Sequence, residues 1–124
     1  VIARVLERIG LAEVADNRMR TFSTGMRKRL ALGQLLVRPI EVALMDEPYS
    51  GLDSQGMRLV DEVVADFKAA GTTVLLASHQ DGEAVREAEK TGILRKGHLE
   101  ILPESEPLSR HLSVGGPAGA PEVD

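Results

Sequence analysis

The sequence predicts an α/β fold built around a parallel strand–helix–strand unit, and three stretches carry that prediction. Residues 42–45 (V-A-L-M) form a short apolar run that ends before Pro48, which is typical of a fully buried strand of the parallel type. Residues 72–77 (T-T-V-L-L-A) form a second apolar strand rich in β-branched residues. Between the strands, apolar residues recur at helical spacing: Val60, Val63, Val64 and Phe67. This order predicts two parallel strands joined by a crossover helix.

The chain before this unit is predicted to be helical. Residues 1–9 place apolar side chains at helical spacing, and residues 12–16 allow a further short turn of helix. A longer helix is predicted over 24–37, because Ser23 stands before it as a capping residue and Pro39 ends it.

The chain after the unit is predicted to hold a short helix over 82–89 and then a β-hairpin over 93–102. From residue 103 onward the composition changes to Pro and Gly with little apolar periodicity. Residues 103–124 are therefore predicted to be a disordered tail.

Composition excludes several classes of protein. The 124 residues contain no Cys, which excludes a disulfide framework and a thiolate metal site. The net charge of −4 argues against a dedicated nucleic-acid binder.

No apolar run approaches the roughly 18 residues that span a bilayer, and no secretory leader is recognisable, so we expect a soluble, cytoplasmic protein. Because the chain starts at Val1 directly in helical periodicity, we also expect a missing N-terminal part.

Candidate functional residues converge on one edge of the predicted sheet. Asp46 and Glu47 end the first strand, and His79 follows the second. Ligands of open α/β sheets bind beyond the carboxyl ends of the strands, so these side chains are well placed to act on one. Residues 23–26 begin a helix, whose free N–H groups and partial positive charge suit an anion. Taken singly, an acidic pair, a lone His and a helix start are commonly structural, so the prediction depends on their convergence.

Four motifs together resemble the ATP-binding subunit of ABC transporters: F-S-T-G-M, V-A-L-M-D-E-P, S-G-L-D and S-H. In that family the signature motif, Walker B strand, catalytic Glu, D-loop and H-loop His follow in the same order. The resemblance covers residues 1–102, of which 1–39 correspond to the helical signature region and 40–102 to the Walker B, D-loop and H-loop region. It implies a P-loop NTPase-like α/β fold, represented by the C-terminal part of the domain, with 103–124 outside it.

The resemblance implies a role for each of four residues near the carboxyl ends of the predicted strands. Asp46 would hold Mg²⁺, as a Walker B Asp does. Glu47 would act as general base and polarise the attacking water. His79 would contact the γ-phosphate of ATP and help to position that water. Asp53 would couple the two sites of a dimer, although it also suits an ordinary helix N-cap.

The signature segment is implied to bind the γ-phosphate of ATP held by an opposite subunit, through Ser23, Thr24, Gly25 and Met26. Gly25 permits close approach of the backbone. Thr24 and Met26 depart from the family's usual Leu-Ser-Gly-Gly-Gln, and the Ser-x-Gly-Met form resembles exporter-type ATPases, including haem and drug exporters. Tyr49 stands where the family often has Thr, outside the roles given above.

The larger departure is that the sequence has no G-x-x-x-x-G-K-[ST] loop and no Gly-Lys dipeptide at all. Nothing in it would cradle the α- and β-phosphates, and neither the Gln-bearing loop nor the adenine-stacking aromatic is identifiable. We expect these parts upstream of Val1. The chain alone is therefore predicted not to bind ATP measurably.

Three functions remain open on this evidence. The first is an ATP-hydrolysing subunit of an ABC exporter, in a homo- or heterodimer, peripheral on the inner face of the cell membrane with a transmembrane permease; haem export would place it in cytochrome c biogenesis. The second is a soluble ABC-type ATPase of DNA repair or translation, against which the net charge of −4 counts, and no nucleic-acid partner is expected. The third is a non-catalytic, partner-binding half, against which the intact Asp46, Glu47 and His79 count.

Overall fold

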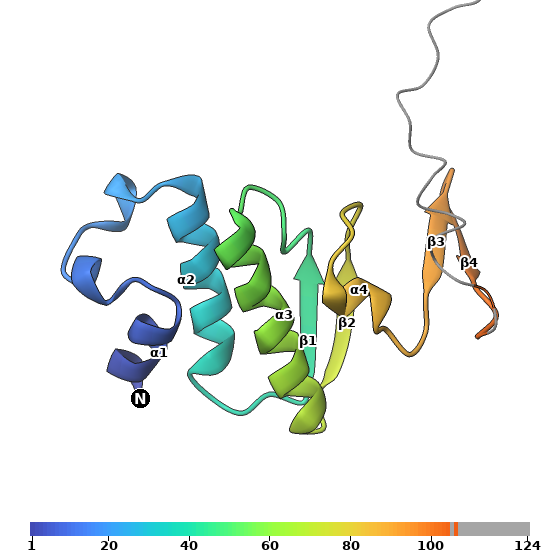
Figure 1. The fold of residues 1–124 in the computed structure, drawn as a ribbon, viewed down its shortest axis with the longest axis horizontal. Coiled ribbons are helices and arrows are strands. Elements are labelled where there is room, and N and C mark those ends of the chain that lie inside the picture. The colour runs from blue at the N-terminus through green and yellow to red at the C-terminus, as the bar shows by residue number, and fades with distance from the viewer. Residues whose placement is uncertain (105, 107–124) are drawn as a thin grey trace, which may run out of the picture. The chain divides into compact units, whose positions relative to one another are not determined.

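The computed structural model describes residues 1–104 and 106 (Figure 1). It divides into two compact units, residues 1–85 and the residues from Arg86 onward, and each is described by itself. Most of the predicted disordered tail falls on residues 105 and 107–124, which lie outside the described residues.

The first unit holds three α-helices, two 3₁₀ helices and two strands within residues 1–77. They follow the predicted order, except that the second 3₁₀ helix lies in a segment for which the sequence predicts no element. They are α1 (Ile2–Arg8), η1 (Ala12–Val14), η2 (Met19–Thr21), α2 (Thr24–Leu36), β1 (Val42–Asp46), α3 (Ser54–Ala69) and β2 (Thr73–Ala77). The predicted turn of helix over 12–16 is a 3₁₀ helix. The short helix predicted over 82–89 is only α4 (Glu83–Arg86).

Strands β1 and β2 are parallel, with α3 as the crossover between them, so the predicted unit is confirmed. Their register runs from Val42 opposite Thr73 to Asp46 opposite Ala77. Figure 1 shows α3 lying along the two strands. The core forms on that side, where α3 buries five apolar side chains: Leu59, Val60, Val63, Val64 and Phe67.

The prediction of a fully buried first strand is wrong. Ala43 and Met45 are buried, but Val42 is 58% exposed and Leu44 70% exposed. Successive side chains of a strand point to opposite faces, and helix α3 covers only one of them. On the other face Leu75 of β2 is 67% exposed, so among the described residues the sheet has one covered and one open apolar face.

Helices α1 and α2 pack through a small residue. Gly33 of α2 is buried, and a Cβ atom there would lie 2.7 Å from Ile9 Cδ1 and 3.2 Å from Val5 Cγ1. Ile9 is fully buried at this contact. The close approach therefore lies between the C-terminal half of α2 and the end of α1.

The second unit contains the predicted hairpin. Strands β3 (Gly92–Arg95) and β4 (His98–Ile101) are antiparallel, with Arg95 opposite His98. The two turn residues, Lys96 and Gly97, have φ of 48° and 80°. Positive φ at both central positions is the conformation that a tight two-residue hairpin requires.

Candidate functional site

The two acidic residues lie where β1 leaves the sheet. Asp46 is the last residue of β1, and the Glu47 N–H donates to the Ala77 carbonyl of β2 at 2.8 Å. Glu47 has a φ of 49°, which is uncommon for a residue with a Cβ atom. Strained backbone of this kind often marks functional sites, because surrounding structure has to hold it in place.

Glu47 and His79 are in direct contact across the ends of the two strands. His79 Nδ1 lies 2.8 Å from Glu47 Oε2, and the backbone N–H of His79 donates to the same oxygen at 3.4 Å. The hydrogen bond from the His79 side chain, with a smaller contribution from the charge of Lys28, lowers the pKa of Glu47 below its ordinary value. The carboxylate is therefore ionised at neutral pH, which is the state that accepts a proton.

Asp46 is exposed at the same edge, on the open face of the sheet. No cluster of three or more His, Asp and Glu side chains is arranged to hold a metal ion in the described part of the chain. A single carboxylate fits Mg²⁺ only as a partial ligand, since this ion usually keeps several waters and is held by one or two carboxylates plus substrate phosphates.

Asp53 is the N-cap of α3. Its Oδ1 accepts from the Gly56 N–H at 2.7 Å and lies 3.1 Å from Arg29 Nη2 of α2. The Gly56 hydrogen bond, followed by the charge of Arg29, lowers the pKa of Asp53. The predicted cap is therefore present, and the same carboxylate links the signature helix to the helix after β1.

The signature segment lies beside the turn after β1. Ser23 is the N-cap of α2, and its Oγ accepts from the Met26 N–H at 3.1 Å. A Cβ atom on Gly25 would lie 3.5 Å from the Gly51 carbonyl oxygen, and one on Gly51 would lie 3.6 Å from Thr24 Cγ2. Residues 23–26 and the acidic turn thus approach each other within one chain.

Two contacts at the site involve residues that the motifs do not identify. Lys28 Nζ donates to the carbonyl oxygen of Glu47 at 2.7 Å, so a cation on the second turn of α2 supports the acidic turn. Tyr49, which the sequence placed outside the functional roles, is fully buried, and its hydroxyl donates to Asp61 of α3. No local pattern predicts these pairs, because their members are 19 and 12 residues apart.

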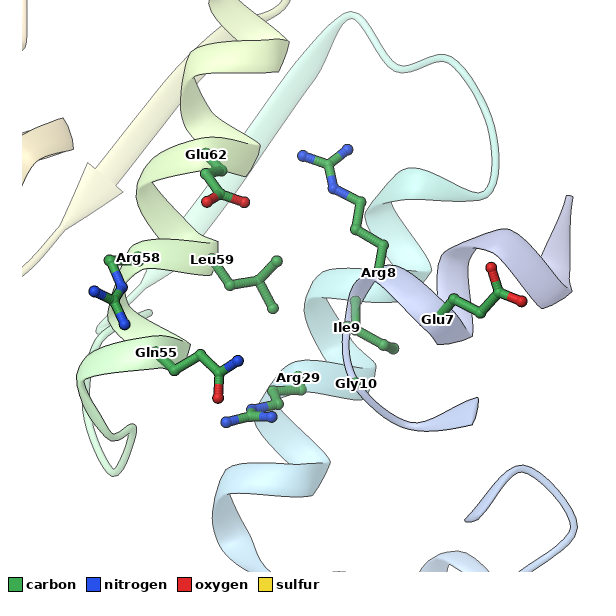
Figure 2. Close-up of a pocket in the computed structure, with 9 residues that line it drawn as sticks. All are labelled: Glu7, Arg8, Ile9, Gly10, Arg29, Gln55, Arg58, Leu59 and Glu62. Atoms are coloured by element: carbon green, nitrogen blue, oxygen red, sulfur yellow. The ribbon is translucent and has the colours of Figure 1, made fainter. Parts of the chain in front are cut away.

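A hollow of about 310 Å³ lies between α1, α2 and α3, away from the acidic edge (Figure 2). Figure 2 shows Arg8, Arg29 and Arg58 around it, together with Glu7 and Glu62. Arg8 is paired with Asp66 at 2.5 Å, and Arg29 is the residue that also contacts Asp53. Asp46, Glu47 and His79 do not line it.

The comparisons with known sequences agree on one family. The family model described as "ABC transporter" matches residues 1–50. The phosphonates import ATP-binding protein PhnC 2 of Pseudomonas syringae is 37% identical over 85% of this chain and 38% of its own length. The linearmycin resistance ATP-binding protein LnrL of Bacillus subtilis is 36% identical over 78% of this chain and 31% of its own. The chain thus spans about a third to two fifths of the length of these relatives.

Solved structures show the same fold. An ATP-binding cassette of an ABC transporter in its ADP conformation has a TM-score of 0.65 at 21% identity, over 93% of this chain and 49% of that one. A second structure of that cassette has a TM-score of 0.69 at 22% identity, over 90% and 45% of the two chains. The described residues include no helix that is both long and apolar enough to cross a membrane.

Proposed function

This chain belongs to the family of ABC transporter ATP-binding proteins, and from that premise we propose that its acidic sheet edge is the hydrolytic part of an ATPase site. The observation that carries the proposal is the contact of Glu47 with His79, 2.8 Å apart at the ends of adjacent parallel strands. Glu47 is the general base that takes a proton from the attacking water. His79 orients Glu47 and contacts the γ-phosphate.

Asp46 is the proposed protein ligand for Mg²⁺. It lies next to the general base but on the open face of the sheet, so Asp46 would hold the ion while the contact between His79 and Glu47 stays in place. Mg²⁺ supplies neutralisation of the charge that develops on the β- and γ-phosphates during transfer.

Ser23, Thr24, Gly25 and Met26 are proposed to contact the γ-phosphate of ATP held by an opposite subunit. The bond from Ser23 to Met26 fixes the start of α2, and Gly25 lies close to the backbone of Gly51. Asp53, at the N-terminus of α3 and in contact with Arg29, is proposed to relay the state of that phosphate between the two sites of a homo- or heterodimer.

The 124 residues contain no Gly-Lys loop for the α- and β-phosphates, so ATP binding depends on polypeptide other than the residues described. We propose that the ATPase, once it has a loop that binds the α- and β-phosphates, docks on a transmembrane permease at the inner face of the cell membrane. There it powers transport. Relatives include both an import protein and a resistance protein. Export, of haem or a drug-like compound, is supported here by Met26 of the signature alone.

The test is turnover of the native gene product carrying Glu47→Gln. Phosphate release should fall by about 10²–10⁴-fold, the range typical for loss of a general base, while MgATP binding persists. Glu62→Gln, an exposed acid on α3, is the matched control and should keep wild-type turnover. Wild-type turnover in the Glu47→Gln protein would exclude Glu47 as the base, and copurification with nucleic acid rather than a membrane protein would contradict the transport role.

A further inference from the structure

Tyr49 lies in the turn between β1 and α3, yet its side chain is fully buried. Its hydroxyl donates to Asp61 Oδ1, in the second turn of α3. The same oxygen accepts from the backbone N–H of Ala84 at 3.1 Å. One carboxylate oxygen therefore joins the turn after β1 to the segment that follows β2.

Gly82 adds a second contact between these two segments. A Cβ atom on Gly82 would lie 2.2 Å from Cζ, 2.4 Å from the hydroxyl oxygen and 2.7 Å from Cε2 of Tyr49. No side chain fits between the ring and the backbone at this distance, and the ring is fully buried, so no open space lies beside it. The segment after β2 is therefore packed directly on the Tyr49 ring.

The two residues of the proposed hydrolytic pair lie on the segments that these contacts join. Glu47 is two residues before Tyr49, and His79 is three residues before Gly82. The loop that carries His79 is closed on itself, because Ser78 Oγ accepts from the Gln80 N–H at 3.0 Å and donates to the Gln80 carbonyl at 3.1 Å. Its direction is then set at its two ends, by β2 before it and by the Tyr49 and Asp61 contacts after it.

We propose that Tyr49, Asp61 and Gly82 form a strut that holds the His79 loop against the Glu47 turn, so that Tyr49 and Asp61 are positioning residues for the hydrolytic pair. The catalytic consequence of the strut rests on the proposed function. Its structural consequence does not, because the contact between Glu47 and His79 can be measured in this chain without ATP.

The first experiment compares Asp61→Ala with Asp61→Asn in the 124-residue chain. Alanine removes both hydrogen bonds, whereas asparagine keeps an acceptor oxygen at the same place. We expect Asp61→Ala to speed amide exchange at Ala84 about tenfold and to abolish the nuclear Overhauser contact between the His79 ring and the Glu47 side chain. Asp61→Asn should restore both. Glu62→Ala, at the neighbouring exposed position, is the control and should change neither.

Gly82→Ala tests the packing contact separately, since it leaves every hydrogen-bonding group of the strut in place. The added methyl group should displace the loop and weaken the same contact between His79 and Glu47. If Asp61→Ala and Gly82→Ala both leave that contact at its wild-type intensity, with the chain folded by circular dichroism, the strut is overturned.

Turnover of the native gene product tests the catalytic consequence. Asp61→Ala should lower kcat about tenfold with the affinity for ATP unchanged, and Asp61→Asn should recover most of the loss. A kcat unchanged in Asp61→Ala, although the contact between His79 and Glu47 is lost, would overturn the positioning role. Wild-type turnover in Glu47→Gln would instead reject the proposed function and leave the strut to be judged by the amide-exchange and contact measurements.

Discussion

Asp53 combines a structural bond with a charge interaction on a single oxygen. The Oδ1 atom accepts from the Gly56 N–H, which has no partner within helix α3, and it also lies 3.1 Å from Arg29 Nη2. Both interactions favour the ionised carboxylate and lower the pKa of Asp53. The residue is exposed, so the ion pair is weakened by solvent and by salt.

The pH dependence of stability should report this bond. Because the pKa of Asp53 is lower in the folded chain than in the unfolded one, its contribution is present above the unfolded value of about 3.9 and is lost as the pH falls through the folded value. Wild type should therefore be more stable than Asp53→Asn at pH 7, and this difference should vanish in acid. Urea unfolding of both proteins across this range measures it. A difference independent of pH would show that the charge contributes nothing.

Residues at strand ends could be predicted from the sequence, whereas residues that support them could not. Asp46, Glu47 and His79 follow apolar runs, and a parallel unit brings such positions together. Lys28 and Tyr49 have no such signal. The ammonium group of Lys28 reaches the Glu47 carbonyl across 19 residues of sequence, which no local pattern predicts. The importance of Tyr49 depends on its burial and its bond to Asp61, which only the packed structure defines.

At the scale of elements, the packing of α1 on α2 depends on Gly33. Helix propensity alone favours alanine over glycine in a helix by about 1 kcal/mol. Here the added Cβ would lie 2.7 Å from Ile9 Cδ1, and Ile9 is itself buried, so its side chain can move only by disturbing its neighbours. Overpacking of this kind usually costs about 1–3 kcal/mol, so steric conflict outweighs propensity.

Gly33→Ala should accordingly lower the free energy of unfolding by up to about 2 kcal/mol, the steric cost less the gain in propensity. Chemical denaturation monitored by circular dichroism checks this. Gln34→Ala, the next residue and exposed, is the control and should be neutral or slightly stabilising. An equally stable or more stable Gly33→Ala chain would show that α1 does not hold this close contact with α2 in solution.

Hydrophobic periodicity, together with capping and turn residues, predicted most helices and strands correctly. The parallel unit and the hairpin both appear, and the caps Ser23 and Asp53 begin helices where expected. The burial of β1 was wrongly predicted, because an apolar run does not indicate whether one face of the strand is covered or both. Leu44 belongs to the same run as Met45, yet it lies on the face that α3 does not cover.

At the scale of the whole molecule, the open face of the first unit exposes a group of apolar side chains. Val42, Leu44 and Leu75 are all more than half exposed, and Leu44 lies directly opposite Leu75 in the register. Parallel sheets are ordinarily covered on both faces. An uncovered apolar surface favours association, because each contact removes that surface from water.

We therefore expect the chain to self-associate with rising concentration, and Leu44→Lys to shift it towards monomer. The substitution should change the free energy of unfolding by no more than about 0.5 kcal/mol, since the side chain is already exposed. Sedimentation velocity over a concentration series measures the effect. Gln34→Lys makes the same change of charge on an exposed position of α2 and should leave association as in wild type. Equal association of the two variants would mean that the open face is not involved.

The chain contains the proposed hydrolytic pair but no loop that would hold the α- and β-phosphates of ATP. Glu47 and His79 form their contact within the chain, but the sequence has no Gly-Lys loop, and charge at the acidic edge repels a polyphosphate. Mg²⁺ at Asp46 alone would replace little of that lost binding, because one carboxylate is a partial ligand. Calorimetric titration of MgATP into the chain should therefore show no saturable heat at micromolar concentrations. Micromolar binding would mean that the α- and β-phosphates are held by groups outside the motifs, and the hollow lined by Arg8, Arg29 and Arg58 would be the first place to test by substitution.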